Sequence, residues 1–139
     1  MYSLREQIKR HEGFSSAPYQ CTAGKITIGY GRNLEDVGIS EEEAEELLKG
    51  DINKVYSQLI NYQWFAELDK IRSGVIVNMT FNLGLRGMLK FIKMINALSL
   101  KDYELAAKEM LDSRWARQVG GRAAELAEQM RTGEYDERL

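Results

Sequence analysis

Residues 12–31 carry three side chains that could do chemistry: a carboxylate, a thiol and a hydroxyl. Glu12 is followed by a glycine, Cys21 is the only cysteine of the chain, and Thr27 leads into a Gly-Tyr-Gly sequence. A carboxyl group can act as general acid or base, a thiolate as base or nucleophile, and a hydroxyl can hold a water molecule. The elements around this stretch decide whether the three could act together.

Glu12 is expected at the end of a helix. Ser3 and Glu6 form a capping box that predicts a helix beginning near Leu4, and Gly13 is expected to end it. The carboxylate of Glu12 would then lie beside the negative end of the helix dipole, where its charged form is disfavoured. A carboxyl group that holds its proton suits a general acid. A solvated helix-end glutamate without a catalytic role is the alternative that position alone leaves open.

Residues 17–31 have the pattern of a small β-hairpin. The only proline favours extended backbone at the residue before it, and residues 22–24 are typical of a turn. Ile26 and Ile28 alternate with Thr27, which is the periodicity of a strand. We therefore expect Thr27 to face away from both isoleucines and to point into a cleft.

The chain beyond residue 40 has helical patterns. Ser40 and Glu43 form a second capping box, and the apolar spacing predicts a long connecting helix over about 40–61. Residues 68–83 are apolar on nearly every side, which predicts a buried central helix that Gly84 ends. Shorter helices are expected at about 85–91, 93–98, 102–112, 114–118 and 121–131.

The predicted central helix contains side chains with two possible uses. Met79, together with Met88 and Met94 beyond it, is expected to fill the core rather than to bind a ligand. Asn78 and Asn82 lie one helical turn apart in an apolar sequence, so each amide needs a partner. A structural hydrogen bond and a contact facing a cleft are both open for these two residues.

Composition excludes several functional classes. A chain of 139 residues fits one domain, and a net charge of −2 without a basic run gives no reason to expect nucleic acid as a partner. No stretch approaches a membrane span, and the first residues do not resemble a signal peptide, so we expect a protein that stays in the cytoplasm unless it is let out. One histidine and one cysteine are too few for a transition-metal site, and no cofactor-binding loop is present.

Taken in order, the motifs of this chain resemble those of phage-type lysozymes, the endolysin muramidases of tailed phages (glycoside hydrolase family 24). The resemblance covers nearly the whole chain. It rests on Glu12-Gly13, Tyr19, Cys21, Gly24, Thr27-Ile28-Gly29-Tyr30-Gly31, Gly38-Ile39-Ser40, Glu43-Ala44, Leu47-Leu48, Asn78 to Gly84, Gly87, Phe91, Ser113-Arg114-Trp115, Arg122-Ala123 and Arg131-Thr132-Gly133.

The resemblance implies a Glu-8x-Asp-5x-Thr arrangement at a cleft between a small β lobe and a larger helical lobe. Glu12 and Thr27 match its first and last members. By the resemblance, Glu12 protonates the glycosidic oxygen between N-acetylmuramic acid and N-acetylglucosamine, the middle residue and Thr27 position a water, and the anomeric carbon is inverted. Arg122 matches an arginine that pairs with the glutamate. Candidate sugar contacts carried over by position are Asn33, Phe81, Asn82 and Arg114.

Three features depart from the family pattern. Cys21 stands where the family most often has aspartate; it could hold the water, act as a thiolate base, attack the sugar with retention, or be inert. Arg32 stands where many relatives have histidine in a structural ion pair, so an altered salt bridge is expected. The segment 31–40 is short, which predicts a trimmed β lobe. The acidic isoelectric point suits an anionic wall poorly unless positive charge gathers locally, as at Arg114, Arg117 and Arg122.

We therefore predict a mainly helical α+β, lysozyme-like protein of one domain, 1–139. Its small lobe spans about 12–39, its connecting helix about 40–61, and its helical lobe about 62–139 plus the N-terminal helix. The predicted activity is hydrolysis of the β-1,4 bond of bacterial peptidoglycan by a monomer without cofactor or metal, held in the host cytoplasm until release to the wall. The alternative is a silent peptidoglycan-binding or scaffolding domain on the same fold.

Overall fold

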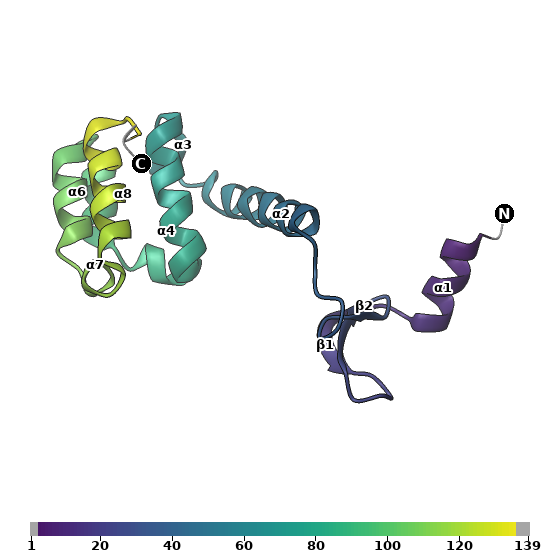
Figure 1. The fold of residues 1–139 in the computed structure, drawn as a ribbon. Helices are drawn as coiled ribbons and strands as arrows, with labels where there is room; N and C mark the ends of the chain where they lie inside the picture. The colour runs from purple at the N-terminus through teal and green to yellow at the C-terminus, as the bar shows by residue number, and fades with distance from the viewer. Residues whose placement is uncertain (1–2, 136–139) are drawn as a thin grey trace. The chain divides into compact units, whose positions relative to one another are not determined.

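A computed structural model describes residues 3–135 of the chain. The chain forms two compact units, Met1–Leu47 and Leu48–Leu139 (Figure 1). The first unit holds a helix, a small antiparallel sheet and the start of a second helix, and the second is entirely helical. The mainly helical α+β fold class is thereby confirmed. No helix within residues 3–135 is both long and apolar enough to cross a membrane.

The first unit begins with α1 (Leu4–Glu12), whose ends are those predicted. The Ser3 side chain accepts a hydrogen bond from the backbone N–H of Glu6 at 3.2 Å, and Gly13 follows with φ +71°. The sheet contains β1 (Ser15–Gln20), β2 (Ile26–Gly29) and β3 (Arg32–Asn33) in the order β1-β2-β3, with both pairs antiparallel. The two-residue β3 extends the predicted hairpin into a three-stranded sheet.

Thr27 lies at the centre of this sheet, paired with Tyr19 on one side and Asn33 on the other. Its side chain is 3% exposed, whereas the neighbouring Ile26 is 42% exposed. The alternation of the strand was predicted correctly, but the side that carries Thr27 is the covered one within this unit. The predicted place of Thr27 at a cleft stays a prediction.

An ion pair joins the sheet to the start of α2 (Glu41–Leu59). Arg32 donates from Nη1 and Nη2 to the two carboxylate oxygens of Glu43, at 3.0 and 2.7 Å, and from Nη1 to the carbonyl of Gly38 at 3.0 Å. Glu43 also accepts from the backbone N–H of Ser40 at 2.9 Å, while Ser40 accepts from that of Glu43, so the predicted capping box is confirmed. The Arg32 bond is the main cause that lowers the pKa of Glu43 to about 2, and the Ser40 N–H adds to it.

The second unit consists of the rest of α2 and six further helices in the described part of the chain. Their bounds are α3 (Gln63–Ala66), α4 (Lys70–Leu89), α5 (Ile92–Ser99), α6 (Tyr103–Leu111), α7 (Arg114–Val119) and α8 (Gly121–Thr132). The short helix α3 was not predicted. Gly84 interrupts the central helix where predicted: its φ of +78° is not helical, and α4 consists of two helical stretches joined by a kink at this residue.

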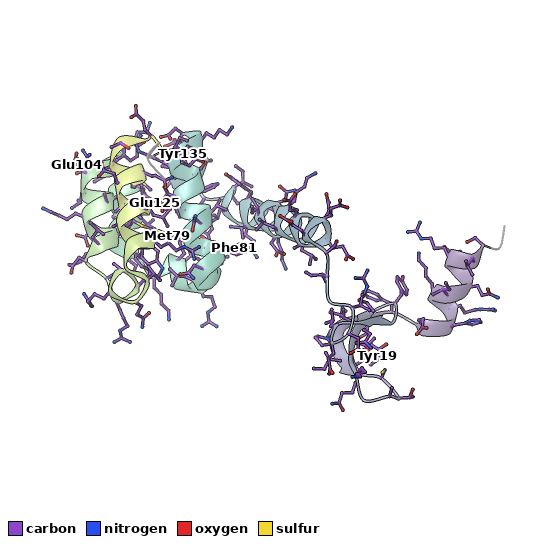
Figure 2. All side chains as sticks on the ribbon, in the orientation of Figure 1. Tyr19, Met79, Phe81, Glu104, Glu125 and Tyr135 are labelled. Atoms are coloured by element: carbon purple, nitrogen blue, oxygen red, sulfur yellow. The ribbon has the colours of Figure 1, made fainter. Side chains whose placement is uncertain are left out.

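The apolar core of the described residues lies wholly in the helical part, between Leu59 and Met130. Met79, Met88 and Met94 are at most 1% exposed, so their predicted role as core residues is confirmed. Figure 2 labels Met79 and Phe81 on α4; the first is completely buried and the second is 48% exposed. The central helix is therefore not apolar all round: it has an exposed side that includes Asn78, Phe81 and Asn82.

Arg72 connects three helices of this unit. From α4 it donates through Nε to the carbonyl of Met130 at 2.6 Å and through Nη2 to that of Arg131 at 3.0 Å, both near the end of α8. Its guanidinium lies 3.8 Å from the ring centroid of Tyr103 at the start of α6. Asp69, which caps α4, holds Nη1 at 2.9 Å. A planar fork can satisfy these groups at once, and a lysine ammonium could not.

The Arg32–Glu43 pair predicts a pH-dependent contribution to the stability of the first unit. A carboxyl group whose pKa is about 2 when folded and near 4.5 when unfolded stabilises the fold fully above the higher value. That stabilisation is lost as the pH falls from 4.5 towards 2. Glu43→Gln should lower the melting temperature of the sheet, followed by its amide NMR signals, near neutral pH, and the difference from the wild type should vanish near pH 2. Glu42→Gln, at an exposed neighbour, is the control; a gap unchanged at low pH would contradict the prediction.

The Arg72 contacts predict that Arg72→Lys destabilises the helical unit by about 1–3 kcal/mol, since hydrogen bonds to two carbonyls near the end of α8 are lost together. Urea unfolding followed by tryptophan fluorescence measures this, because both tryptophans belong to the helical unit. The matched variant Lys70→Ala removes a cation from the exposed first turn of the same helix and should cost little. An equal loss of unfolding free energy in the two variants would show that the hydrogen bonds of the Arg72 guanidinium contribute nothing to stability.

Candidate functional site

Glu12 ends α1 where that helix packs against the turn between β2 and β3. Lys9 places its ammonium 5.4 Å from the ring centroid of Tyr30, and the Phe14 ring contacts the same ring at a tilt of 50°, with centroids 5.5 Å apart. These contacts lie on both sides of Glu12 along the chain. The carboxylate itself lies directly against Gly31 in the same turn. Glu12 is an exposed helix-end residue whose carboxylate contacts the turn at Gly31, so the alternative of a solvated helix end stays open.

Cys21 lies in a tight turn just after β1. Its N–H donates to the carbonyl of Lys25 at 2.9 Å, and its carbonyl accepts from the N–H of Gly24 at 2.8 Å. The pKa of the thiol is lowered, first by the backbone N–H of Lys25, then by that of Ala23 and by the Thr27 hydroxyl, against partial burial that raises it. Backbone donors aimed at sulfur favour the thiolate, which is the form that acts as base or nucleophile.

Thr27 lies beside this turn on β2. Its Oγ1 donates to the carbonyl of Lys25 at 2.9 Å. A hydroxyl has one hydrogen, so when Thr27 bonds Lys25 it cannot donate to Cys21, and the backbone N–H groups are the constant cause of the lowered thiol pKa. The oxygen of Thr27 keeps its acceptor capacity. A thiol and a hydroxyl oxygen placed together in this way can hold a water molecule between them.

Two of the four residues predicted to contact sugar have their amides engaged in structural hydrogen bonds. Asn33 donates to the Asp36 carboxylate at 3.1 Å and accepts from the Asp36 N–H at 3.0 Å, which stabilises the turn after β3. Asn82 accepts from the indole N–H of Trp115 at 2.8 Å and so orients the ring that is buried beneath α7. For Asn82 the structural reading left open by the sequence has direct support.

Phe81 and Arg122 border a hollow of about 270 Å³ in the helical unit, together with Leu48, Ile52, Tyr56, Gly74, Val77 and Asn78. Arg122 donates from Nε and Nη2 to the side-chain oxygen of Asn78, at 3.0 and 2.6 Å. Asn78 therefore has the partner that its amide required, and this partner is an arginine of α8. The predicted pairing of Arg122 with Glu12 joins residues of different units and stays a prediction.

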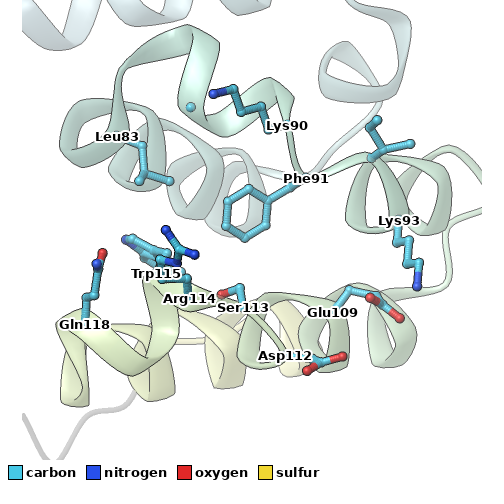
Figure 3. Close-up of a pocket in the computed structure, with 12 residues that line it drawn as sticks. Leu83, Lys90, Phe91, Lys93, Glu109, Asp112, Ser113, Arg114, Trp115 and Gln118 are labelled. Atoms are coloured by element: carbon cyan, nitrogen blue, oxygen red, sulfur yellow. The ribbon is translucent and has the colours of Figure 1, made fainter.

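Arg114 borders a second pocket of about 540 Å³ in the same unit (Figure 3). Phe91 and Trp115 form its aromatic floor, with ring centroids 6.0 Å apart. Lys90 and Lys93 lie on its rim with Arg114, and none of the three makes an ion pair among residues 3–135.

Sequence reasoning missed the two lysines of this pocket. Residues 84–101 contain Arg86, Lys90, Lys93 and Lys101 and no acidic residue, which was the available signal. Glu109 and Asp112 also line the pocket, so its rim carries charges of both signs.

Comparison with known proteins identifies the family. The phage lysozyme family model matches residues 9–133. An endolysin of Acyrthosiphon pisum secondary endosymbiont phage 1 is 34% identical over 124 residues, covering 86% of this chain and 82% of that protein. A probable T4-type lysozyme of Dictyostelium discoideum is 27% identical, with 94% of this chain and 95% of that protein covered. The pre-baseplate central spike protein of Enterobacteria phage T4 is 27% identical over 96% of this chain but only 28% of its own length.

The hydrogen bonds to Cys21 predict a thiol that reacts faster than an ordinary cysteine near neutral pH, since its lowered pKa raises the thiolate fraction. The rate of alkylation by iodoacetamide, measured against pH, should reach half its maximum at a lower pH in the folded protein than in the same protein unfolded in urea. The single cysteine makes the signal unambiguous. Coincident pH profiles would show that the turn does not favour the thiolate.

Proposed function

This chain belongs to the phage lysozyme family, and from that premise we propose that it is an endolysin-type muramidase that hydrolyses the β-1,4 bond between N-acetylmuramic acid and N-acetylglucosamine in bacterial peptidoglycan. The observation that carries the proposal is the family match over residues 9–133 together with Glu12, Cys21 and Thr27 at the expected spacing. The small sheet and helical body agree with the lysozyme fold that the resemblance implies.

Glu12 is proposed as the general acid. Its proton passes to the glycosidic oxygen as the bond to the anomeric carbon breaks, so that the leaving sugar departs as a neutral alcohol. Support comes from its place at the end of α1, packed on the turn before β3. After the reaction Glu12 is a carboxylate and must regain a proton from solvent before the next cycle.

Cys21 and Thr27 are proposed to position or activate the attacking water. The water gives its oxygen to the anomeric carbon and its proton to the thiolate, if the thiol is ionised, or to solvent. The lowered pKa of Cys21 supports a base role, and the acceptor capacity of Thr27 supports a positioning role. Direct attack by the thiolate would instead form a covalent glycosyl–enzyme and retain the configuration at the anomeric carbon.

Sugar contacts are proposed for Phe81 and Arg114, with Asn33 and Asn82 acting through their neighbours. Phe81 is half-exposed and offers an apolar surface beside a hollow. Arg114 is exposed and makes no ion pair within residues 3–135, so it is available to an anionic wall polymer. This local positive charge offsets a chain whose net charge is −2.

The test is release of reducing sugar from purified peptidoglycan by the wild type and by variants whose melting temperatures match it. Glu12→Gln should lose about 10²–10⁴-fold activity, because the amide has no proton to give. Cys21→Ala should lose about 10²-fold or more, whereas Cys21→Asp should remain active because it restores a carboxylate base. Cys21→Ser, which holds water but does not ionise near neutral pH, separates positioning from base catalysis.

Proton NMR of the first product gives the anomer and distinguishes an activated water from a thiolate nucleophile. Inversion supports the water, and retention supports covalent attack by sulfur. Full activity of Cys21→Ala would remove that residue from the mechanism. Binding of peptidoglycan by the wild type without any release of sugar would favour a silent wall-binding or scaffolding domain, for which the cysteine in place of aspartate is the motivating observation.

A further inference from the structure

Gly31 lies so close to Glu12 that no other residue fits without moving the carboxylate. A methyl group built on Gly31 would lie 2.6 Å from Oε2 of Glu12, 2.8 Å from its Cδ and 3.1 Å from its Cγ. We propose that the Glu12 carboxylate is positioned by contact with the Cα of Gly31, which carries no side chain; this contact surface is called the seat of the carboxylate. Gly31 is then a positioning residue for the acid of the reaction. The inference rests on the proposed function only in so far as Glu12 acts as that acid.

The seat is formed by packing and not by polar bonds. Within residues 3–47, the Glu12 carboxylate makes no hydrogen bond or ion pair, so only contact with the turn limits its position in this unit. The turn between β2 and β3 is itself held in place by Tyr30, which contacts Lys9 and Phe14 on either side of Glu12. Gly31 is therefore brought to the carboxylate by the two contacts of Tyr30, with Lys9 in the last turn of α1 and with Phe14 just after this helix.

Gly29 provides a matched control two residues away. Both glycines have left-handed backbone, with φ of +66° at Gly29 and +75° at Gly31, so alanine meets similar backbone strain at either position. A methyl group built on Gly29 meets nothing within 4 Å, whereas one on Gly31 meets the carboxylate. The pair of substitutions separates the effect of strain from the effect of displacing Glu12.

The contact at Gly31 involves the far end of a flexible side chain, which can swing away at small cost to the fold. Gly31→Ala should therefore lose about as much melting temperature as Gly29→Ala. Its kcat on peptidoglycan should nevertheless fall about 10²-fold further, because a displacement of about 1 Å at a catalytic group costs that much. KM should change alike in both variants, since the substitution moves the acid and not the contacts to substrate.

An activity-independent measurement accompanies these kinetics. The carboxyl carbon of Glu12, observed by ¹³C NMR in protein labelled at glutamate, should shift in Gly31→Ala and stay in place in Gly29→Ala. A shift with the kcat loss supports the seat and its role. A shift in a protein whose wild type releases no sugar supports the seat while the proposed function fails.

Three results would overturn the positioning role. They are an unmoved carbon signal in Gly31→Ala, equal kcat in the two glycine variants, and failure of Gly31→Ala to fold under conditions where Gly29→Ala folds. Failure to fold would show that the contact between Gly31 and Glu12 is needed for the fold itself and not only for positioning the carboxylate.

Discussion

The N-terminal unit has almost no interior, and this constraint governs how its reactive side chains are placed. Among its described residues Thr27 alone is buried, and the apolar core of the chain begins only at Leu59. A fold without apolar burial must take its geometry from directional interactions. Here these are the backbone pairing of the sheet, left-handed glycines at the turns, and the Arg32–Glu43 pair that connects the sheet with α2. Glu12, Cys21 and Thr27 are therefore held mainly by hydrogen bonds and by close backbone approach.

The helical unit is built by the opposite means. Its buried methionines, leucines and alanines come from α2, α4, α5, α6 and α8, and Arg72 connects α4, α6 and α8 through one guanidinium. A core of this kind leaves the surface free to vary, and the unit carries on it the hollow beside Phe81 and the pocket ringed by Lys90, Lys93 and Arg114. Glu109 and Asp112 also line that pocket, so its rim carries charges of both signs.

The backbone of the turn around Cys21 acts on two side chains, the thiol of Cys21 and the hydroxyl of Thr27. A cysteine thiol is ordinarily mostly neutral at neutral pH, yet the N–H groups of Ala23 and Lys25 favour the thiolate of Cys21. The same turn fixes the Lys25 carbonyl that takes the hydroxyl proton of Thr27. Backbone geometry thus acts on both side chains at once.

What the sequence determined by itself was local. The caps at Ser3, Ser40 and Gly13 and the helix periods follow from interactions within four residues, so α1, α2 and most later helices could be placed in advance. The ordered motifs identified the family. Tertiary structure alone decided the contacts between residues distant in sequence: the partner of Arg32, the forks of Arg72 and Arg122, the burial of Thr27 and the approach of Gly31 to Glu12. No local period encodes such contacts, because they depend on how whole elements meet.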